Sequence, residues 1–239
     1  MARRRFFVDS IHCGEAELRG EEARRLTRVL RVEPGQRFEI SDQHQAWLAE
    51  IIEARGERVR LRVVEPVETE EMPVRIALFA ALIKFDRFEW IIEKATELGV
   101  ESIRPVETAR SEKGLLEAAQ KRSERWQRVV REASQQARRV RAPEILPAVR
   151  WQPPGAEAAG WRYFLEEAQA PPLLRTLPAD RQRLAQVALV TGPEGGWTDA
   201  EREAAAAGGW QPVSLGPNVL RAETAALAAI TVVVNAWLI

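Results

Sequence analysis

The pattern of apolar and polar positions divides the chain into two parts. Up to residue 64, short apolar segments partly alternate with polar positions and are separated by turn residues, which predicts a small β-rich module. Within it, Ala23, Leu26, Val29 and Leu30 recur at helical spacing and predict one helix over residues 21–30. The predicted strands of this module are residues 5–8, 37–40, 46–54 and 57–64.

An acidic stretch bounded by prolines, residues 65–73, has little to bury and is predicted to be a linker. After it, strand-length apolar runs alternate with helical patterns, which indicates an α/β domain with a mostly parallel sheet covered on both faces. The predicted domains are therefore residues 1–70 and 71–239.

The elements of the second part follow from the same pattern. Asp86 is predicted to begin a helix, with Glu89 as its capping-box partner and Gly99 as its C-terminal stop. Further helices are expected at residues 121–139, 199–207 and 223–237, strands at residues 74–82, 102–106, 163–165, 187–191 and 212–215, and loops at residues 151–160 and 170–179.

Composition narrows the class of protein. Of 239 residues, 46% are hydrophobic and 29% charged, and 35 basic residues balance 35 acidic ones, which excludes a histone-like tail or an acidic solvating segment as the main identity. Cys13 is the single cysteine, so no internal disulfide is expected and a reducing cytoplasm is favoured. With only two histidines beside it, a zinc site is not expected. Neither a targeting segment nor a membrane span is predicted.

Positive charge is concentrated in one predicted helix. Residues 121–141 hold eight basic and two acidic residues in a chain of zero net charge. Helical spacing divides this segment into two faces. The basic face is either an ordinary solvated surface or a surface that contacts the phosphates of a nucleic acid. The apolar face carries Trp126, Val129, Val130, Ala133 and Ala137, and the basic face carries Arg125, Arg128, Arg131, Arg138 and Arg139.

Two glycine-containing loops each join a predicted strand to a predicted helix. Thr191-Gly-Pro-Glu-Gly-Gly-Trp-Thr198 is neither a P-loop nor a dinucleotide fingerprint, but its glycines let a ligand approach backbone N–H groups closely. The alternative is a helix-start turn with Thr198 or Asp199 as the N-cap. The second loop, Leu215-Gly-Pro-Asn-Val-Leu-Arg-Ala-Glu-Thr-Ala225, places Arg221 where α/β folds bind ligands. Glu223 lies at the positive end of the next helix, where it could merely cap.

These two loops together strongly resemble the ribosomal RNA small-subunit methyltransferase E family, the 16S rRNA uridine-N3 methyltransferases of the SPOUT superfamily. The resemblance spans essentially the whole chain except residues 151–180. It is supported by residues 4–8, 29–31 and 89–100, and by Lys84, Arg110-Ser111 and Arg125-Trp126.

The resemblance implies a PUA-like β-barrel at residues 1–70 and a SPOUT α/β domain with a trefoil knot at residues 71–239. It also implies an obligate homodimer in the cytoplasm, S-adenosylmethionine as cofactor and the 16S rRNA of the 30S subunit as partner, with no metal. The cofactor residues would be Leu165, Thr191, Gly192, Gly195, Gly196, Leu215, Gly216, Asn218 and Leu220.

Methylation at N3 of uracil requires that the N3 proton be removed and the resulting anion stabilised. Arg221 is the candidate for stabilising the anion, and Glu194 or Glu223 is the candidate for accepting the proton. The expected RNA contacts are Arg3, Arg4, Arg5, Arg28, Arg31, Arg125, Arg128, Arg131, Arg138 and Arg139.

Two other functions fit the same sequence. One is a SPOUT methyltransferase that acts on transfer RNA or on a ribose 2′-hydroxyl. The other is a non-catalytic RNA-binding assembly factor, which the two intact glycine loops disfavour.

Overall fold

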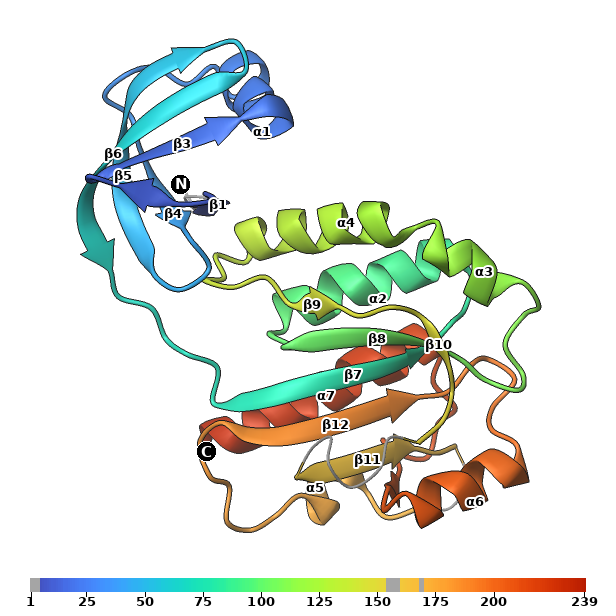
Figure 1. Cartoon of the computed structure of the whole chain (residues 1–239). Coiled ribbons are helices and arrows are strands. Elements are labelled where there is room, and N and C mark those ends of the chain that lie inside the picture. The colour runs from blue at the N-terminus through green and yellow to red at the C-terminus, as the bar shows by residue number, and fades with distance from the viewer. Residues whose placement is uncertain (1–4, 154–159, 168–169) are drawn as a thin grey trace. The chain divides into compact units, whose positions relative to one another are not determined.

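The computed structural model describes residues 5–153, 160–167 and 170–239, and the chain divides into two compact units (Figure 1). The first unit comprises Met1–Glu70 together with Ser134–Ala142, and the second comprises Glu71–Ala133 and Pro143–Ile239. A segment from the middle of the chain therefore completes the first unit.

The first unit is built on a six-stranded sheet with the strand order β1-β4-β5-β6-β3-β2. Strands β1 and β4 are parallel, and the other neighbours are antiparallel. Its core holds Phe6, Leu18, Ile40, Ile51 and Leu61, all almost fully buried. The strands are β1 (Arg5–Phe7), β2 (Ile11–His12), β3 (Glu15–Arg19), β4 (Arg37–Ser41), β5 (Ala46–Arg55) and β6 (Arg58–Val67).

The sequence pattern misses β2 and β3, and it ends β6 too early. Glu65, Pro66 and Val67 were expected in the linker, but they pair with β5. Register shifts in β5, between Leu48 and Ala49 and again before Glu53, interrupt the strict alternation of inward and outward side chains. A strand with such irregularities cannot be delimited by a period of two alone.

The predicted helix at residues 21–30 is present, but it changes halfway from an α-helix to a π-helical turn. It begins as α1 (Gly20–Arg24) and continues as the π-helical turn η1 (Arg25–Val29), closed by a hydrogen bond from the Leu30 N–H to the Arg25 carbonyl. Ala23 and Leu26 are buried as an amphipathic helix requires, whereas Val29 and Leu30 are exposed. The wider π turn breaks the 3.6-residue period that groups the four side chains.

The second unit contains a parallel sheet with the strand order β10-β8-β7-β12-β11-β13 and with β9 beside β8. The predicted α/β class with a parallel sheet is therefore confirmed. Its strands are β7 (Val74–Ala81), β8 (Ser102–Glu107), β9 (Glu144–Ile145), β10 (Val149–Arg150), β11 (Trp161–Leu165), β12 (Ala185–Thr191) and β13 (Gln211–Val213).

Helices cover both faces of this sheet. Helix α7 packs on β7 and β12, and α2 packs on α7. On the other face, Ala205 of α6 packs with Phe79, Phe164, Trp197 and Trp210. No helix of the described chain is long and apolar enough to cross a membrane. The helices are α2 (Phe85–Glu97), α3 (Leu115–Gln120), α4 (Ser123–Gln136), α5 (Leu173–Thr176), α6 (Asp199–Ala207) and α7 (Ala222–Leu238).

Two helix predictions need correction. Helix α2 begins at Phe85 after Lys84, without a side-chain cap, and Glu89 accepts hydrogen bonds from Arg122 and Arg125 instead of forming a capping box. Helix α4 is shorter than predicted, because Lys121 and Arg122 form a turn before it and Arg138 adopts a left-handed φ of 57° after it.

The loop predictions hold only in part. Residues 170–179 contain the short helix α5, and α3 was not predicted. In the predicted loop at residues 151–160, residues 154–159 lie outside the described part of the chain.

Candidate active site at the carboxyl edge of the parallel sheet

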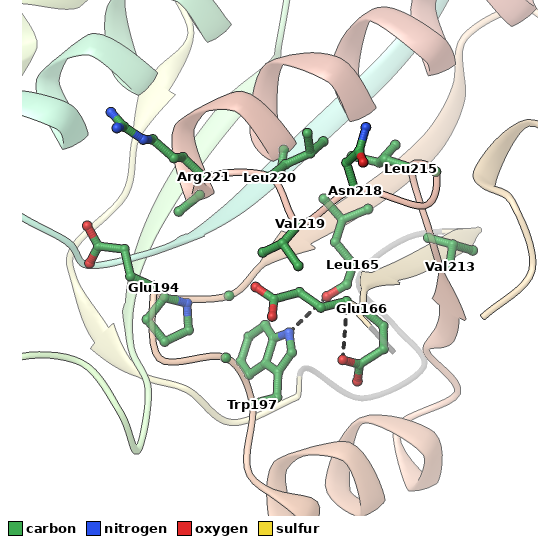
Figure 2. A pocket seen from close by; sticks show the side chains of 17 residues that line it. Leu165, Glu166, Glu194, Trp197, Val213, Leu215, Asn218, Val219, Leu220 and Arg221 are labelled. Atoms are coloured by element: carbon green, nitrogen blue, oxygen red, sulfur yellow. Dashed lines mark hydrogen bonds between the residues drawn. The ribbon is translucent and has the colours of Figure 1, made fainter. Parts of the chain in front are cut away.

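A cavity of about 240 Å³ lies where β11, β12 and β13 end (Figure 2). Leu165 is the last residue of β11, Gly192 follows β12, and Val213 is the last residue of β13. All three line the cavity, because parallel strands bring their carboxyl ends to one edge, where open α/β sheets bind ligands.

Most of the predicted cofactor residues contribute to the wall of the cavity. Thr191 is instead buried within β12, and Gly195 lies outside the wall against Arg110. The predicted residues in the wall are Leu165, Gly192, Gly196, Leu215, Gly216, Asn218 and Leu220.

Trp197 holds the first glycine loop against the end of β11. Its indole N–H donates a hydrogen bond of 2.9 Å to the Leu165 carbonyl (Figure 2). Its ring centroid lies 4.4 Å from that of Phe164. A Cβ atom at Gly192 would lie 2.9 Å from the indole nitrogen, closer than such contacts allow. The position therefore requires glycine, and the two strand ends are fixed relative to each other.

The loop that follows β8 supports the same glycine loop from another side. Nη1 of Arg110 donates a hydrogen bond of 2.8 Å to the Gly195 carbonyl, and a Cβ atom at Gly195 would lie 3.1 Å from the Arg110 Cβ. The Ala109 N–H donates to Glu201 of α6, which also forms the capping box with Thr198. Hydrogen bonds thus join the loop after β8 to both the glycine loop and the start of α6.

The second glycine loop leads into α7, whose N-cap is Arg221. Gly216 has a φ of +130°, in the range that favours glycine. The Arg221 side chain forms no capping hydrogen bond and lines the cavity. Figure 2 shows Arg221 and Glu194 extending to the same side of the cavity.

The two candidate carboxylates differ in their surroundings. Glu194 lines the cavity, is half-exposed, and accepts a hydrogen bond of 2.7 Å from Nη1 of Arg87. Glu223 is only 8% exposed, does not contribute to the cavity wall, and its Oε2 has no hydrogen-bond partner in the part of the chain that the structure describes.

Sequence reasoning missed several residues of the wall. Glu166 and Glu167 directly follow β11 and line the cavity, and Glu166 is held by two hydrogen bonds from Arg202, of 2.6 and 3.2 Å. Two carboxylates just after a predicted strand end are a signal that could have identified them. Pro193, Trp197, Val213, Val219, Ala222 and Ala225 complete the wall.

The predicted RNA-binding arginines occupy different environments. Arg5 is only 3% exposed and donates to Glu39 and to the Arg138 carbonyl, so it serves the core of the first unit and cannot contact RNA from the surface. Arg28 and Arg31 are exposed. Arg3 and Arg4 lie outside the described residues.

The arginines of the basic helix also differ from one another. Arg125 donates two hydrogen bonds of 2.7 Å to Glu89, and Arg138 pairs with Glu39. Arg128 and Arg131 are exposed, and Arg139 is half-buried. The apolar face is buried at Trp126, Val130 and Ala133, while Val129 and Ala137 are partly exposed.

Comparison with known families defines the class of protein. A model described as "RNA methyltransferase domain" matches residues 70–234, and one described as "RNA methyltransferase PUA domain" matches residues 18–64. The chain is 38% identical over 215 residues to ribosomal RNA small subunit methyltransferase E of Synechocystis, covering 84% of this chain and 66% of that relative. It is 30% identical over 223 residues to the Bacillus subtilis protein of the same name, covering 90% of this chain and 87% of that relative.

The solved structures agree with this assignment. A ribosomal RNA small subunit methyltransferase E from Neisseria gonorrhoeae, bound to S-adenosyl methionine, superposes with a TM-score of 0.84 at 30% identity over 96% of this chain and 95% of that one. A Legionella pneumophila structure with bound SAM superposes with a TM-score of 0.87 at 29% identity, over 97% of both chains. The chain belongs to the ribosomal RNA small subunit methyltransferase E family, which confirms the resemblance inferred from its glycine loops.

Proposed function

We propose that this protein transfers a methyl group from S-adenosylmethionine to N3 of a uridine in the decoding region of 16S rRNA, giving 3-methyluridine. The observation that carries the proposal is the cavity between the two glycine loops, with Arg221 and Glu194 on its wall. The named relatives support ribosomal RNA as the class of substrate, since this chain matches them over most of their length.

The cavity wall fits S-adenosylmethionine. Leu165, Leu215 and Leu220 offer apolar surface for the flat face of a purine, and the glycines bring backbone groups within reach of polar atoms. Glu167 places negative charge beside a cationic ligand, whereas the charge of Glu166 is balanced by its ion pair with Arg202. When bound, the cofactor supplies an electrophilic methyl group on a sulfonium sulfur.

Arg221 has the position and the charge to stabilise the substrate anion. Arg221 lines the cavity, and its side chain is exposed and extends to the same side as Glu194 (Figure 2). Loss of the N3 proton leaves negative charge on N3 and the flanking carbonyl oxygens of uracil, and a fixed cation lowers the energy of that state. Arg221 would therefore favour the nucleophilic form of the base.

We assign proton acceptance to Glu194 rather than to Glu223. An acceptor must reach the proton directly or through one water, and Glu194 belongs to the cavity wall whereas Glu223 does not. Arg87 fixes the Glu194 carboxylate through its ion pair. If Glu223→Gln abolished methylation while Glu194→Gln retained it, the two roles would be reversed.

RNA binding is assigned to the exposed arginines of the predicted set that are not paired with Glu89 or Glu39, together with the half-buried Arg139. Arg28 and Arg31 in the first unit, and Arg128 and Arg131 on α4, would contact phosphates and orient the RNA. RNA affinity should then fall steeply with salt concentration, because each phosphate contact releases counterions. A flat salt dependence would contradict this assignment.

The proposed domains are a PUA-like RNA-binding domain at residues 1–70 and a SPOUT methyltransferase domain at residues 71–239, with a trefoil knot near the C-terminus. The knot is expected from membership of the family, and the strand order β12-β11-β13 is compatible with it. An experimental structure of this chain would test whether its C-terminal segment passes through a knot. We further propose a homodimer, to be tested by sedimentation equilibrium, that acts on the 30S subunit in the cytoplasm.

In vitro methylation with labelled cofactor tests the reaction, using 30S particles and naked 16S rRNA in parallel. Nucleoside mass spectrometry should identify 3-methyluridine as the product. A 2′-O-methylated nucleoside would support the ribose alternative, and labelling of neither substrate would contradict the proposal.

The substitution Arg221→Ala tests the electrostatic role. Removal of a donor that stabilises a developing anion typically costs about 100-fold to 1000-fold in rate, and we expect a decrease of that order in kcat with unchanged cofactor affinity. Arg175→Ala, a basic residue of α5, is the control. Activity within about twofold of wild type, equivalent to about 0.4 kcal/mol, would exclude this role for Arg221.

A further inference from the structure

The first unit exposes two consecutive apolar side chains at the end of η1. Val29 is 71% exposed and Leu30 is 46% exposed, and we call this pair the apolar tip. In the described part of this unit the only other large apolar side chain with comparable exposure is Val64 on β6, at 43%. Single exposed apolar residues are ordinary, but an adjacent pair on one turn is less so.

The apolar tip is held in place rather than frayed. Leu26 before it is 1% exposed and Val32 after it is 8% exposed, so both flanks are anchored in the core. The Thr27 hydroxyl lies 2.7 Å from the Gly56 carbonyl and 2.9 Å from the Ala23 carbonyl, positions in which it can donate to either. The π turn and the left-handed Arg31, with a φ of 48°, direct the tip outward. Such irregular backbone is often retained at functional sites.

Two cations flank the apolar tip. Arg28 precedes it and Arg31 follows it, and both are exposed. Neither has an ion-pair partner among residues 5–153, 160–167 and 170–239, whereas the nearby Arg24 pairs with Glu57. Their charge is therefore available to an external anion.

We propose that Val29 and Leu30 pack against the face of an unstacked RNA base while Arg28 and Arg31 bind the phosphates on either side. Unpaired RNA segments present apolar base faces between phosphates at short intervals, which matches an apolar pair between two cations. Aliphatic side chains serve as wedges against bases in other nucleic-acid complexes. The inference rests on the proposed function, because it assumes an RNA substrate.

RNA affinity measured as a function of salt separates the two kinds of contact. The variants are Val29→Ser/Leu30→Ser and Arg28→Gln/Arg31→Gln, with Val64→Ser as the matched exposed control. The serine pair should weaken binding to naked 16S rRNA about tenfold or more at every salt concentration without changing the salt slope. The glutamine pair should also reduce the slope of log affinity against log salt by about 1.4, since each phosphate contact on single-stranded nucleic acid contributes about 0.7.

The outcomes distinguish this inference from the proposed function. If the wild type binds and methylates RNA and the serine pair binds RNA with unchanged affinity, the proposed role of the apolar tip is wrong, while the proposed function is unaffected. Loss of affinity for 30S particles but not for naked RNA would also overturn it, because the tip would then contact a ribosomal protein. Failure of the wild type to bind either RNA would instead contradict the proposed function. An unchanged urea unfolding transition of the serine pair, relative to the wild type, should confirm that the first unit of the variant is folded.

Discussion

At the scale of single residues, the glycines of the first loop serve the protein itself as well as the ligand. Gly192 leaves room for the Trp197 indole, and Gly195 leaves room for the Arg110 side chain. Neither has a positive φ among the described backbone angles, so the requirement is steric. Glycine-rich loops are usually explained by close ligand approach, whereas here two of the glycines also permit tight packing beneath the cavity.

Gly192→Ala should therefore weaken cofactor binding. The added methyl group would force Trp197 away from its hydrogen bond to the Leu165 carbonyl and shift both walls of the cavity. We expect the Kd for S-adenosylmethionine, measured by calorimetry, to rise about tenfold or more, equivalent to about 1.4 kcal/mol. Gly160→Ala is the control, since its Cβ would meet nothing closer than 3.5 Å. Equal affinities of the two variants would contradict the packing argument.

At the scale of elements, the cavity depends on loops that do not all line it. Arg110 comes from the loop after β8, yet its guanidinium holds the Gly195 carbonyl. The same loop is attached to α6 through the Ala109 N–H and Glu201. The geometry of the glycine loop is thus set by β8 and α6 as well as by its own sequence.

Arg110→Met should loosen the glycine loop while keeping most of the side-chain volume. A hydrogen bond of this kind contributes about 1 kcal/mol, so we expect the Kd for S-adenosylmethionine to rise about fivefold. Arg110→Lys should restore part of the affinity. Arg150→Met removes an exposed ion pair with Glu107 and should leave the Kd unchanged. An unchanged Kd for Arg110→Met would show that the bond does not position the loop.

Strand β11 carries the single tyrosine of the chain, which allows a direct test of burial. Burial raises the pKa of the Tyr163 phenol to about 12, because the ionised form is disfavoured away from water. The raised pKa contributes stability that is present below the ordinary value of about 10 and is lost between about pH 10 and 12. Ultraviolet absorbance should show phenolate appearing near pH 12 in the folded protein and near pH 10 in denaturant. Titration of the folded protein near pH 10 would contradict a buried β11.

At the scale of the whole chain, Ser134–Ala142 is part of the first unit although most of α4 belongs to the second. Glu39 accepts hydrogen bonds from Arg5 and from Arg138, and the Ser41 hydroxyl donates to the Val140 carbonyl at 2.7 Å. Residues about 100 positions apart in sequence are joined by these contacts, which complete the first unit.

Glu39→Gln should destabilise the first unit strongly. The substitution leaves the Arg5 guanidinium buried without its counterion, and removal of one partner of a buried pair costs about 3–5 kcal/mol. Glu50→Gln, which removes more exposed pairs with Arg37 and Arg62, is the control and should cost less than about 1 kcal/mol. Urea unfolding measures both variants. A loss below about 1 kcal/mol for Glu39→Gln would show that the buried pair does not stabilise the unit.

The sequence alone determined the parallel α/β sheet, the family, and about half of the residues of the cavity wall. Periodicity marks the strands and helices, and the two glycine loops carry the motifs that resemble the family. It could not determine that Arg5 is buried, that Val29 and Leu30 are exposed, or that Arg110 supports Gly195. Each of these depends on contacts between residues far apart in the chain, or on a π turn that changes the helical period. Tertiary structure therefore decided which arginines face the solvent and which neighbours make the glycines necessary.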